Sequence, residues 1–268
     1  MLVVTGGEPT LSPHLPDVVA EARKRGIGSI ELQTNGVGVG RNPQLAARLA
    51  EAGLTRALVS LHSHRSEVSD AITRAPGTWE LTVAGIDALL DAGVEVALST
   101  VLSVPNAADA PGLVEWVAQR WGARVSIVWA AAHPVNEAAA LDPTAIAPLS
   151  LIGPPLRRAL ALCIERGVPF GNMGERCGVP PCVLGADPRI VELPGPPTAD
   201  VAQSFVHLEP CTACALRDLC PGVRRLYARL HGSDGLEPLT PERAAPLRAL
   251  ATPRPGCGGT SSIHQGGE

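Results

Sequence analysis

Short apolar runs alternate with amphipathic segments up to about residue 130, and this alternation constrains the fold more than any other feature of the chain. Each strand-and-helix step takes about 30 residues, the usual size of a βαβ unit. Right-handed crossovers between such units place the strands in one parallel sheet and curl it towards a barrel. The pattern therefore predicts an α/β fold with a (β/α) barrel architecture.

The expected strands are the apolar runs at 2–4, 29–32, 57–61, 94–104 and 124–130. Helices are expected to start at Ser12-Pro13, Asn42-Pro43, Thr78 and Ala110. The run 2–4 has no polar residue, as in a strand covered on both faces. It is short for the first strand of a closed barrel, so we expect a further strand and helix upstream and a partial barrel in this chain.

Composition changes after residue 170. Residues 171–210 are rich in Gly and Pro and predict irregular structure, and the cysteines gather from here onward. Beyond residue 238 the chain is Pro, Arg and Ala with a Gly-rich end, which predicts a short helix and then disorder. We therefore expect a partial barrel over 1–170, a small cysteine-rich extension over 171–238 and a tail over 239–268.

Charge and hydropathy exclude several classes of partner. The net charge is −4 and Lys24 is the sole lysine, so no dense basic face indicates nucleic acid or membrane binding. No apolar run reaches the roughly 18 to 20 residues of a membrane span, and the start lacks a secretory signal. A cytoplasmic location is the default prediction. The seven cysteines all follow residue 160, and a reducing compartment favours metal ligation or free thiols.

The loop Thr5-Gly6-Gly7-Glu8-Pro9-Thr10 is the most informative segment. Two glycines after a strand let the backbone approach a ligand, and Glu8 stands at the carboxyl end of the sheet, where parallel α/β folds bind ligands. A carboxylate in that place suits an ammonium group. The alternative is an ordinary strand-to-helix turn with a solvated glutamate.

This loop resembles the Gly-Gly-Glu-Pro motif of the radical S-adenosylmethionine (SAM) superfamily, and the likeness extends over most of the first 135 residues. The stretches 31–36 (Glu-Leu-Gln-Thr-Asn-Gly), 59–64 (Val-Ser-Leu-His-Ser-His) and 74–78 (Arg-Ala-Pro-Gly-Thr) resemble later motifs of the superfamily, in the same order. The resemblance implies reductive cleavage of SAM to methionine and a 5′-deoxyadenosyl radical, which abstracts hydrogen from a substrate.

By this resemblance, the methionine end of SAM would be held by Gly6, Gly7, Glu8 and Pro9, with Asn35 and Ser60 facing the same cavity. For Asn35-Gly36 an ordinary turn is the alternative. His62 and His64 could line the substrate cavity, but two histidines without a third ligand do not define a metal site.

One departure from the superfamily concerns its C-x3-C-x2-C motif, which ligates the catalytic [4Fe-4S] cluster. The first cysteine of this chain is Cys163. We expect the cluster to be ligated by a missing amino-terminal segment, so that this chain alone is inactive. The alternative is a non-catalytic, truncated barrel remnant.

A second group of candidate residues is Cys211-x2-Cys214-x5-Cys220, with Cys182 upstream. Thiolates at such spacing can chelate a zinc ion or an iron-sulfur cluster, and buried thiols without metal are the alternative. The spacing resembles the twitch or SPASM extension of radical SAM enzymes, which implies an auxiliary [4Fe-4S] cluster. Cys177 competes with Cys182 as the fourth ligand. We interpret Cys163 and Cys257 as structural or incidental.

The resemblance also implies partners. A reductant such as ferredoxin or flavodoxin would supply electrons, and a peptide is the expected substrate, because auxiliary-cluster extensions often accompany enzymes that modify peptides. The rival interpretation is a binding protein with a nucleotide-shaped pocket and a structural zinc or iron-sulfur site.

Overall fold

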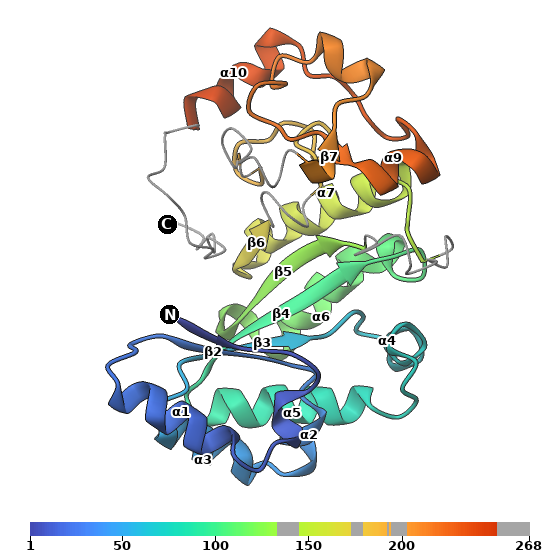
Figure 1. The fold of residues 1–268 in the computed structure, drawn as a ribbon. Coiled ribbons are helices and arrows are strands. Elements are labelled where there is room, and N and C mark those ends of the chain that lie inside the picture. Colours follow the sequence, from blue (N-terminus) through green and yellow to red (C-terminus); the bar gives the residue numbers. More distant parts are fainter. Residues whose placement is uncertain (133–144, 173–178, 192, 194–202, 251–268) are drawn as a thin grey trace. The chain divides into compact units, whose positions relative to one another are not determined.

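The computed structural model describes residues 1–132, 145–172, 179–191, 193 and 203–250 (Figure 1). Its backbone contacts separate the chain into two compact units. The first comprises residues 1–100, 116–128 and 167–169, and the second comprises 101–115, 129–166 and 170–268. The predicted division at residues 170 and 238 stays a prediction.

The first six strands form one sheet in the order β1-β2-β3-β4-β5-β6. They are β1 (Leu2–Val4), β2 (Ile30–Thr34), β3 (Arg56–Ser60), β4 (Glu95–Leu102), β5 (Val125–Ala131) and β6 (Phe170–Asn172). Pairing is parallel from β1 to β4, with Leu32 opposite Ala57 and Ala57 opposite Val96. The structure thus confirms the α/β class and the parallel sheet, and among the described strands the sheet is open.

The helices of the first unit follow their strands as predicted, with two additions. They are η1 (Pro9–Leu11), α1 (Leu15–Lys24), α2 (Val37–Arg41), α3 (Gln44–Ala52), α4 (Ser66–Thr73), α5 (Trp79–Asp91), and the end of α6 (Ala110–Arg120) with η3 (Gly122–Arg124). The sequence interpretation missed α2 and α4, which are only 5 and 8 residues long. Helices α1, α2, α3 and α5 lie on one side of β1–β3.

Two local predictions were wrong. Helix α1 begins at Leu15, with His14 at its N-cap and Pro16 in its first turn, because Pro9 opens a separate 3-10 turn before it. Strand β1 is not covered on both faces, since Val3 is 36% exposed. On β3, buried Ala57 and Val59 alternate with half-buried neighbours, so this strand is fully buried on one face only, whereas β2 and β5 are buried on both.

Glycines let α2 and α5 pack backbone against backbone. A Cβ on Gly40 would stand 1.9 Å from the Leu81 carbonyl oxygen, and one on Gly85 would stand 2.3 Å from the Gly36 carbonyl oxygen. Side chains larger than hydrogen cannot fit at such distances. The Gly-x-Gly-x-Gly run at 36–40 therefore serves helix packing, and it fixes the turn that follows β2.

The second unit holds the remaining elements. They are η2 (Ala107–Asp109), most of α6, α7 (Leu149–Arg166), β6, β7 (Phe205–Val206), η4 (Glu209–Ala213), β8 (Val223–Arg224), α9 (Arg225–His231) and α10 (Pro241–Leu250). Strands β7 and β8 form a separate antiparallel pair. Helix α10 confirms the short helix expected before the chain end, and the predicted disordered end lies outside the described residues.

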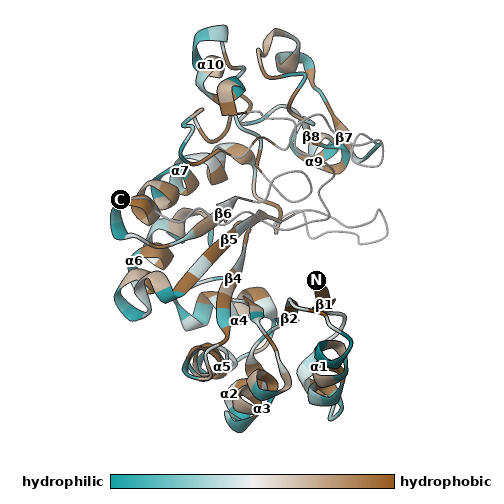
Figure 2. Ribbon diagram, turned by 90° about the vertical axis from the view of Figure 1, so that its left-hand side faces the viewer, coloured by the Kyte–Doolittle hydropathy of each residue, from teal (hydrophilic) through white to brown (hydrophobic). Residues whose placement is uncertain are grey.

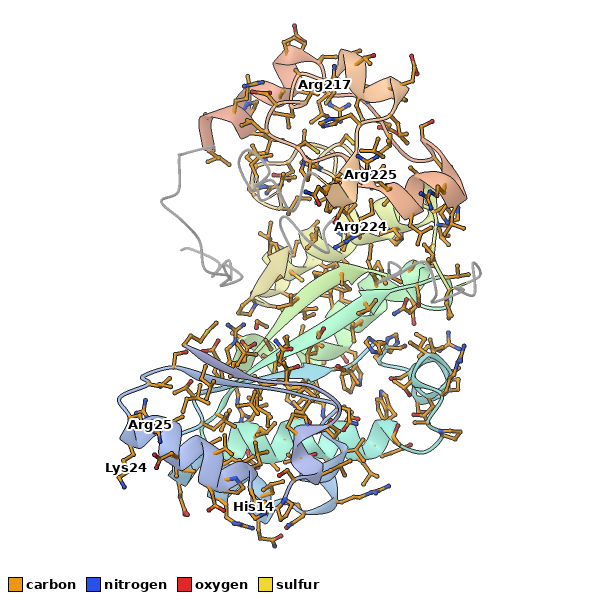
Figure 3. The ribbon with its side chains drawn as sticks, viewed as in Figure 1. His14, Lys24, Arg25, Arg217, Arg224 and Arg225 are labelled. Atoms are coloured by element: carbon orange, nitrogen blue, oxygen red, sulfur yellow. The ribbon has the colours of Figure 1, made fainter. Side chains whose placement is uncertain are left out.

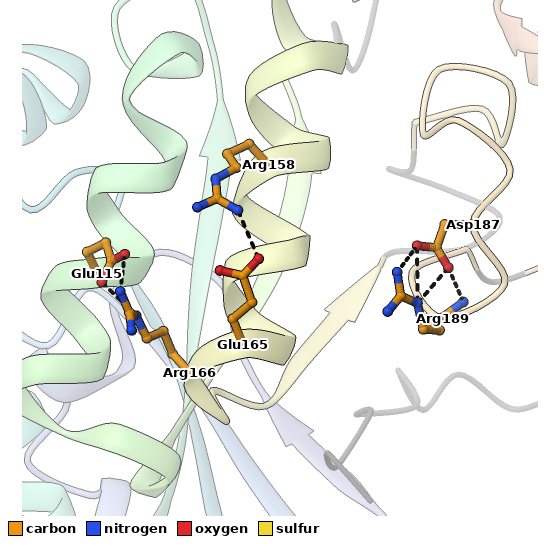
Figure 4. Close-up of polar contacts among 6 residues, drawn as sticks. All are labelled: Glu115, Arg158, Glu165, Arg166, Asp187 and Arg189. Carbon is orange, nitrogen blue, oxygen red and sulfur yellow. Dashed lines mark hydrogen bonds and ion pairs between the residues drawn. The ribbon is translucent and has the colours of Figure 1, made fainter.

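Helix α7 is tied into its unit at both ends. At its start, Leu149 N–H donates to the Tyr227 hydroxyl (2.8 Å) and Ser150 N–H donates to the Asp234 carboxylate (3.1 Å). At its end, Arg166 makes two 3.0 Å hydrogen bonds to Glu115 of α6 (Figure 4). The helix itself is amphipathic: Ile152, Leu156 and Leu160 are buried at helical spacing.

Apolar residues gather along β4 and β5, as Figure 2 shows. Within the part of the chain that the structure describes, no helix has the length and apolarity needed to cross a membrane.

Candidate cofactor and metal sites

The loop after β1 presents open backbone. Gly6 and Gly7 have φ angles of +97° and +43°, and no atom lies within 4 Å of where a Cβ would stand on either residue. Other residues rarely adopt such φ values, so the two glycines are needed for the turn itself. Because space beside them is empty, a ligand could approach the main chain here.

Glu8 joins this loop to the end of β2. Its Oε1 accepts hydrogen bonds from Thr10 N (3.0 Å), Thr10 Oγ1 (2.7 Å) and Thr34 Oγ1 (2.6 Å). Its Oε2 accepts one, from Asn35 N (2.8 Å). The ends of β1 and β2 meet here because the two strands pair in parallel. Glu8 also caps η1, in which Pro9 is the first residue.

The Glu8 carboxylate is ionised, and among the described residues it has no cationic partner. Burial raises its pKa, but the hydrogen bonds from Asn35, Thr34 and Thr10 outweigh burial and hold the pKa below its ordinary value of 4.5. A carboxylate offers about four lone-pair sites, and Oε2 uses one of its two. Glu8 therefore has both the charge and the acceptor capacity to receive a further N–H donor.

Asn35 and Ser60 differ in how the structure uses them. The Asn35 side-chain oxygen accepts a hydrogen bond from Val37 N (2.9 Å), and the Asn35 backbone carbonyl accepts one from Thr82 Oγ1 (2.9 Å). Asn35 therefore organises the turn before α2. Ser60 is half-buried at the end of β3, opposite Ser99 of β4. Their roles towards a cofactor stay predictions.

The two histidines that follow β3 also stay candidates only. Burial lowers the pKa of His62, which keeps its imidazole neutral at pH 7. His64 is half-buried beside it in the chain.

All four predicted cysteine ligands line one cavity of about 20 Å³ in the second unit. Cys211 lies in η4 and Cys214 caps it, with Cys214 N–H donating to the Cys211 carbonyl (3.2 Å). Cys220 ends the next turn, and Cys182 comes from the turn at 180–185. Much of the remaining wall is apolar: Leu216, Val223, Leu236 and Leu239. The structure thus brings together residues 38 positions apart.

Two of the four thiols in this cavity have clearly raised pKa values. Burial, with a smaller contribution from neighbouring Cys211 and Cys214, raises the pKa of Cys182 to about 11 and that of Cys220 to about 12. Without a bound cation, Cys182 and Cys220 are therefore protonated at pH 7. Among the described residues, no three His, Cys, Asp or Glu side chains converge as ligands of a single metal ion would. Cys177 lies outside the described residues.

Sequence reasoning missed the other polar residues at both sites. Thr10 and Thr34 bind Glu8, and parallel pairing of β1 with β2 would have indicated that Thr34 reaches it. At the cysteine cavity, His207 and Arg217 complete the polar wall. Figure 3 labels Arg217 in this unit. No spacing in the sequence pointed to His207, which lies four residues before Cys211 on an irregular segment.

Comparison with known proteins identifies the first part of the chain. Residues 1–117 match the family described as the Radical SAM superfamily, so this segment is a radical SAM superfamily domain. Over 122 residues the chain is 40% identical to a GTP 3′,8-cyclase of Paenarthrobacter nicotinovorans, covering 44% of this chain and 33% of that protein. It is 31% identical over 143 residues to the mycofactocin maturase MftC of Mycobacterium ulcerans, covering 49% and 37%.

A solved structure shares the fold over most of the chain. It is the structure described as native anSMEcpe with bound AdoMet and Kp18Cys peptide, with a TM-score of 0.58 and 15% identity, covering 92% of this chain and 81% of that one. This likeness confirms the α/β fold of radical SAM type. The chain spans only about a third of the length of the first curated relatives it matches, from 28% to 35%.

Proposed function

We propose that this chain belongs to a radical SAM enzyme. We also propose that the loop after β1, residues 5–10 (the Glu8 loop), binds the methionine end of SAM. The observation that carries the proposal is the state of Glu8, an ionised carboxylate held by neutral donors with acceptor capacity left on Oε2. An ammonium group satisfies both features. Gly6 and Gly7 leave the backbone beside it accessible.

The residues near this loop do not fit the catalytic cluster. Thiolates hold [4Fe-4S] clusters, and no cysteine precedes Cys163 in the sequence. We propose that the cluster ligands lie outside these 268 residues and that this chain by itself is inactive. Three cysteines at C-x3-C-x2-C spacing, in frame upstream of Met1 in the gene, would support this view. A stop codon with no such triplet would favour the rival.

For the second unit we propose an auxiliary [4Fe-4S] cluster held by Cys182, Cys211, Cys214 and Cys220. In its favour, the four thiols line one cavity, and thiolates are the ligands that hold such clusters. Such a cluster supplies one-electron redox capacity when bound. A structural zinc remains the alternative occupant.

A peptide is the substrate that we propose, and a ferredoxin or flavodoxin the reductant. The structural neighbour anSMEcpe was solved with a bound peptide, and this supports the choice of substrate class. Support for the reductant comes only from the radical chemistry proposed, which consumes an electron.

The complete protein, reconstituted anaerobically with iron and sulfide and then reduced, tests the proposal. We expect it to convert SAM to 5′-deoxyadenosine, and we expect Glu8→Gln to weaken SAM binding. Glu21→Gln is the matched control, because Glu21 is an exposed α1 carboxylate paired with Arg25. SAM cleavage unaffected by either change would remove the Glu8 loop from the site.

The rival function is SAM or nucleotide binding without catalysis, which requires no catalytic cluster and is therefore also compatible with the absence of cysteine before residue 163. It predicts that ligand binding persists while no 5′-deoxyadenosine forms.

A further inference from the structure

A small antiparallel ribbon stands behind one of the four cysteines. Strands β7 and β8 pair with Val206 opposite Val223, and the Arg224 guanidinium lies over the Phe205 ring at 5.0 Å. This pairing brings the residue after β7, His207, beside the turn that precedes β8. That turn is Cys220-Pro221-Gly222.

Two hydrogen bonds fix Cys220 within this turn. His207 Nε2 lies 2.8 Å from the Cys220 carbonyl oxygen. A carbonyl can only accept, so Nε2 carries the proton and donates. Gly222 N–H donates to Cys220 Sγ at 3.4 Å. One bond thus holds the backbone of Cys220 and the other its sulfur.

Gly222 is required for the second bond. Its φ angle is +89°, and a Cβ would stand 2.3 Å from the Val206 carbonyl oxygen. The ribbon therefore approaches the turn more closely than any side chain at 222 would allow.

We infer that His207 is a positioning residue that orients Cys220 as a ligand before metal arrives. The inference rests on the proposed four-cysteine site. Its physical basis is that outer hydrogen bonds orient ligands and thereby raise metal affinity. His207 also lines the cavity itself, beside Cys211 and Cys214. His207 is thus close enough to influence the position of the cysteine ligands.

The chain offers a matched control in His231. Its Nε2 makes the same kind of bond, to the Ile146 carbonyl oxygen at 3.0 Å, and the residue is half-buried in the same unit. His231 is not among the residues that line the cysteine cavity. Loss of a histidine-to-carbonyl bond can therefore be compared at and away from the cysteines.

The first experiment reconstitutes the chain with iron and sulfide and follows iron loss to a chelator. We expect His207→Phe to release iron about tenfold faster than the parent chain. His207→Gln should restore slow release, because its side-chain amide can donate to the same carbonyl. His231→Phe should match the parent. Equal release from His207→Phe and His231→Phe would overturn the inference.

The second experiment needs no metal. Alkylation of Cys220 in the metal-free chain, followed by mass spectrometry, should be about three- to tenfold faster in His207→Phe than in His231→Phe, since one hydrogen bond no longer holds the turn. Unchanged alkylation would refute the positioning role even if iron binds. A parent chain that takes up no iron would refute the proposed cluster, and the alkylation result would still decide the role of His207.

Discussion

The Glu8 loop and the cysteine cavity differ in how far their polar groups are satisfied before a ligand binds. At Glu8 every described polar partner is already in place, with four hydrogen bonds from three neighbouring residues and a carboxylate that stays ionised. At the cavity, Cys182 and Cys220 carry raised pKa values and an apolar wall surrounds them. The first region is complete before its ligand binds. The second holds neutral thiols until a cation or cluster binds their thiolate forms, and because that ligand binds the folded arrangement of the cysteines, metal should stabilise it.

The largest expected effect is at the cavity. Replacing Cys211 and Cys214 with Ala should reduce reconstituted iron from about four per chain to near zero. Removing the metal should increase hydrogen exchange in residues 203–250 while leaving the Glu8 loop unchanged. Cys163→Ala is the control, since that thiol is buried in α7. Full iron content in the double variant, or one zinc per chain, would contradict the cluster.

At the Glu8 loop we expect a loss of affinity for SAM. Glu8→Gln removes the charge but keeps a carbonyl acceptor, so SAM should bind roughly ten- to hundredfold more weakly while the melting temperature changes little. Calorimetry with SAM measures the difference. Affinity equal to that of Glu21→Gln would mean that Glu8 is only a structural cap.

Overpacking between α2 and α5 should disturb the turn that holds Glu8. Gly85→Ala places a methyl group against the Gly36 carbonyl, and the turn that donates Asn35 N–H to Glu8 must shift. We expect a loss of about 1 to 3 kcal/mol in the free energy of unfolding, measured with denaturant. Gly28→Ala, with no atom within 4 Å of its Cβ, should cost far less. Similar losses in both would show that α2 and α5 relax freely.

The smallest effect is the pH dependence of Glu8. Because its folded-state pKa lies below 4.5, the ionised side chain stabilises the fold above that value, and this contribution disappears as pH falls through the folded-state pKa. From about pH 5 to about pH 3, the parent should lose more stability than Glu8→Gln, by less than about 1 kcal/mol after solvent screening. Parallel stability curves for the two proteins would refute this.

Sequence reasoning succeeded where a pattern is local or repeated. The alternating strand runs predicted the strand-helix order, and the three cysteines of C-x2-C-x5-C line one cavity, although their role as ligands stays a prediction. It failed where the cause was tertiary. The exposed Val3 and the helix α2 depend on neighbours in space, and His207 reaches Cys220 only because β7 pairs with β8.

The anchoring of α7 has a consequence for synthesis on the ribosome. The groups that bind its first turn, the Tyr227 hydroxyl and the Asp234 carboxylate, come 78 and 84 residues after their partners in the chain. At a translation rate of roughly 5 to 20 residues per second, the start of α7 waits roughly 4 to 17 s for Asp234 to be made. During that interval the helix must rely on its own amphipathic face, and nascent chains that stop before residue 227 should leave it vulnerable to proteases.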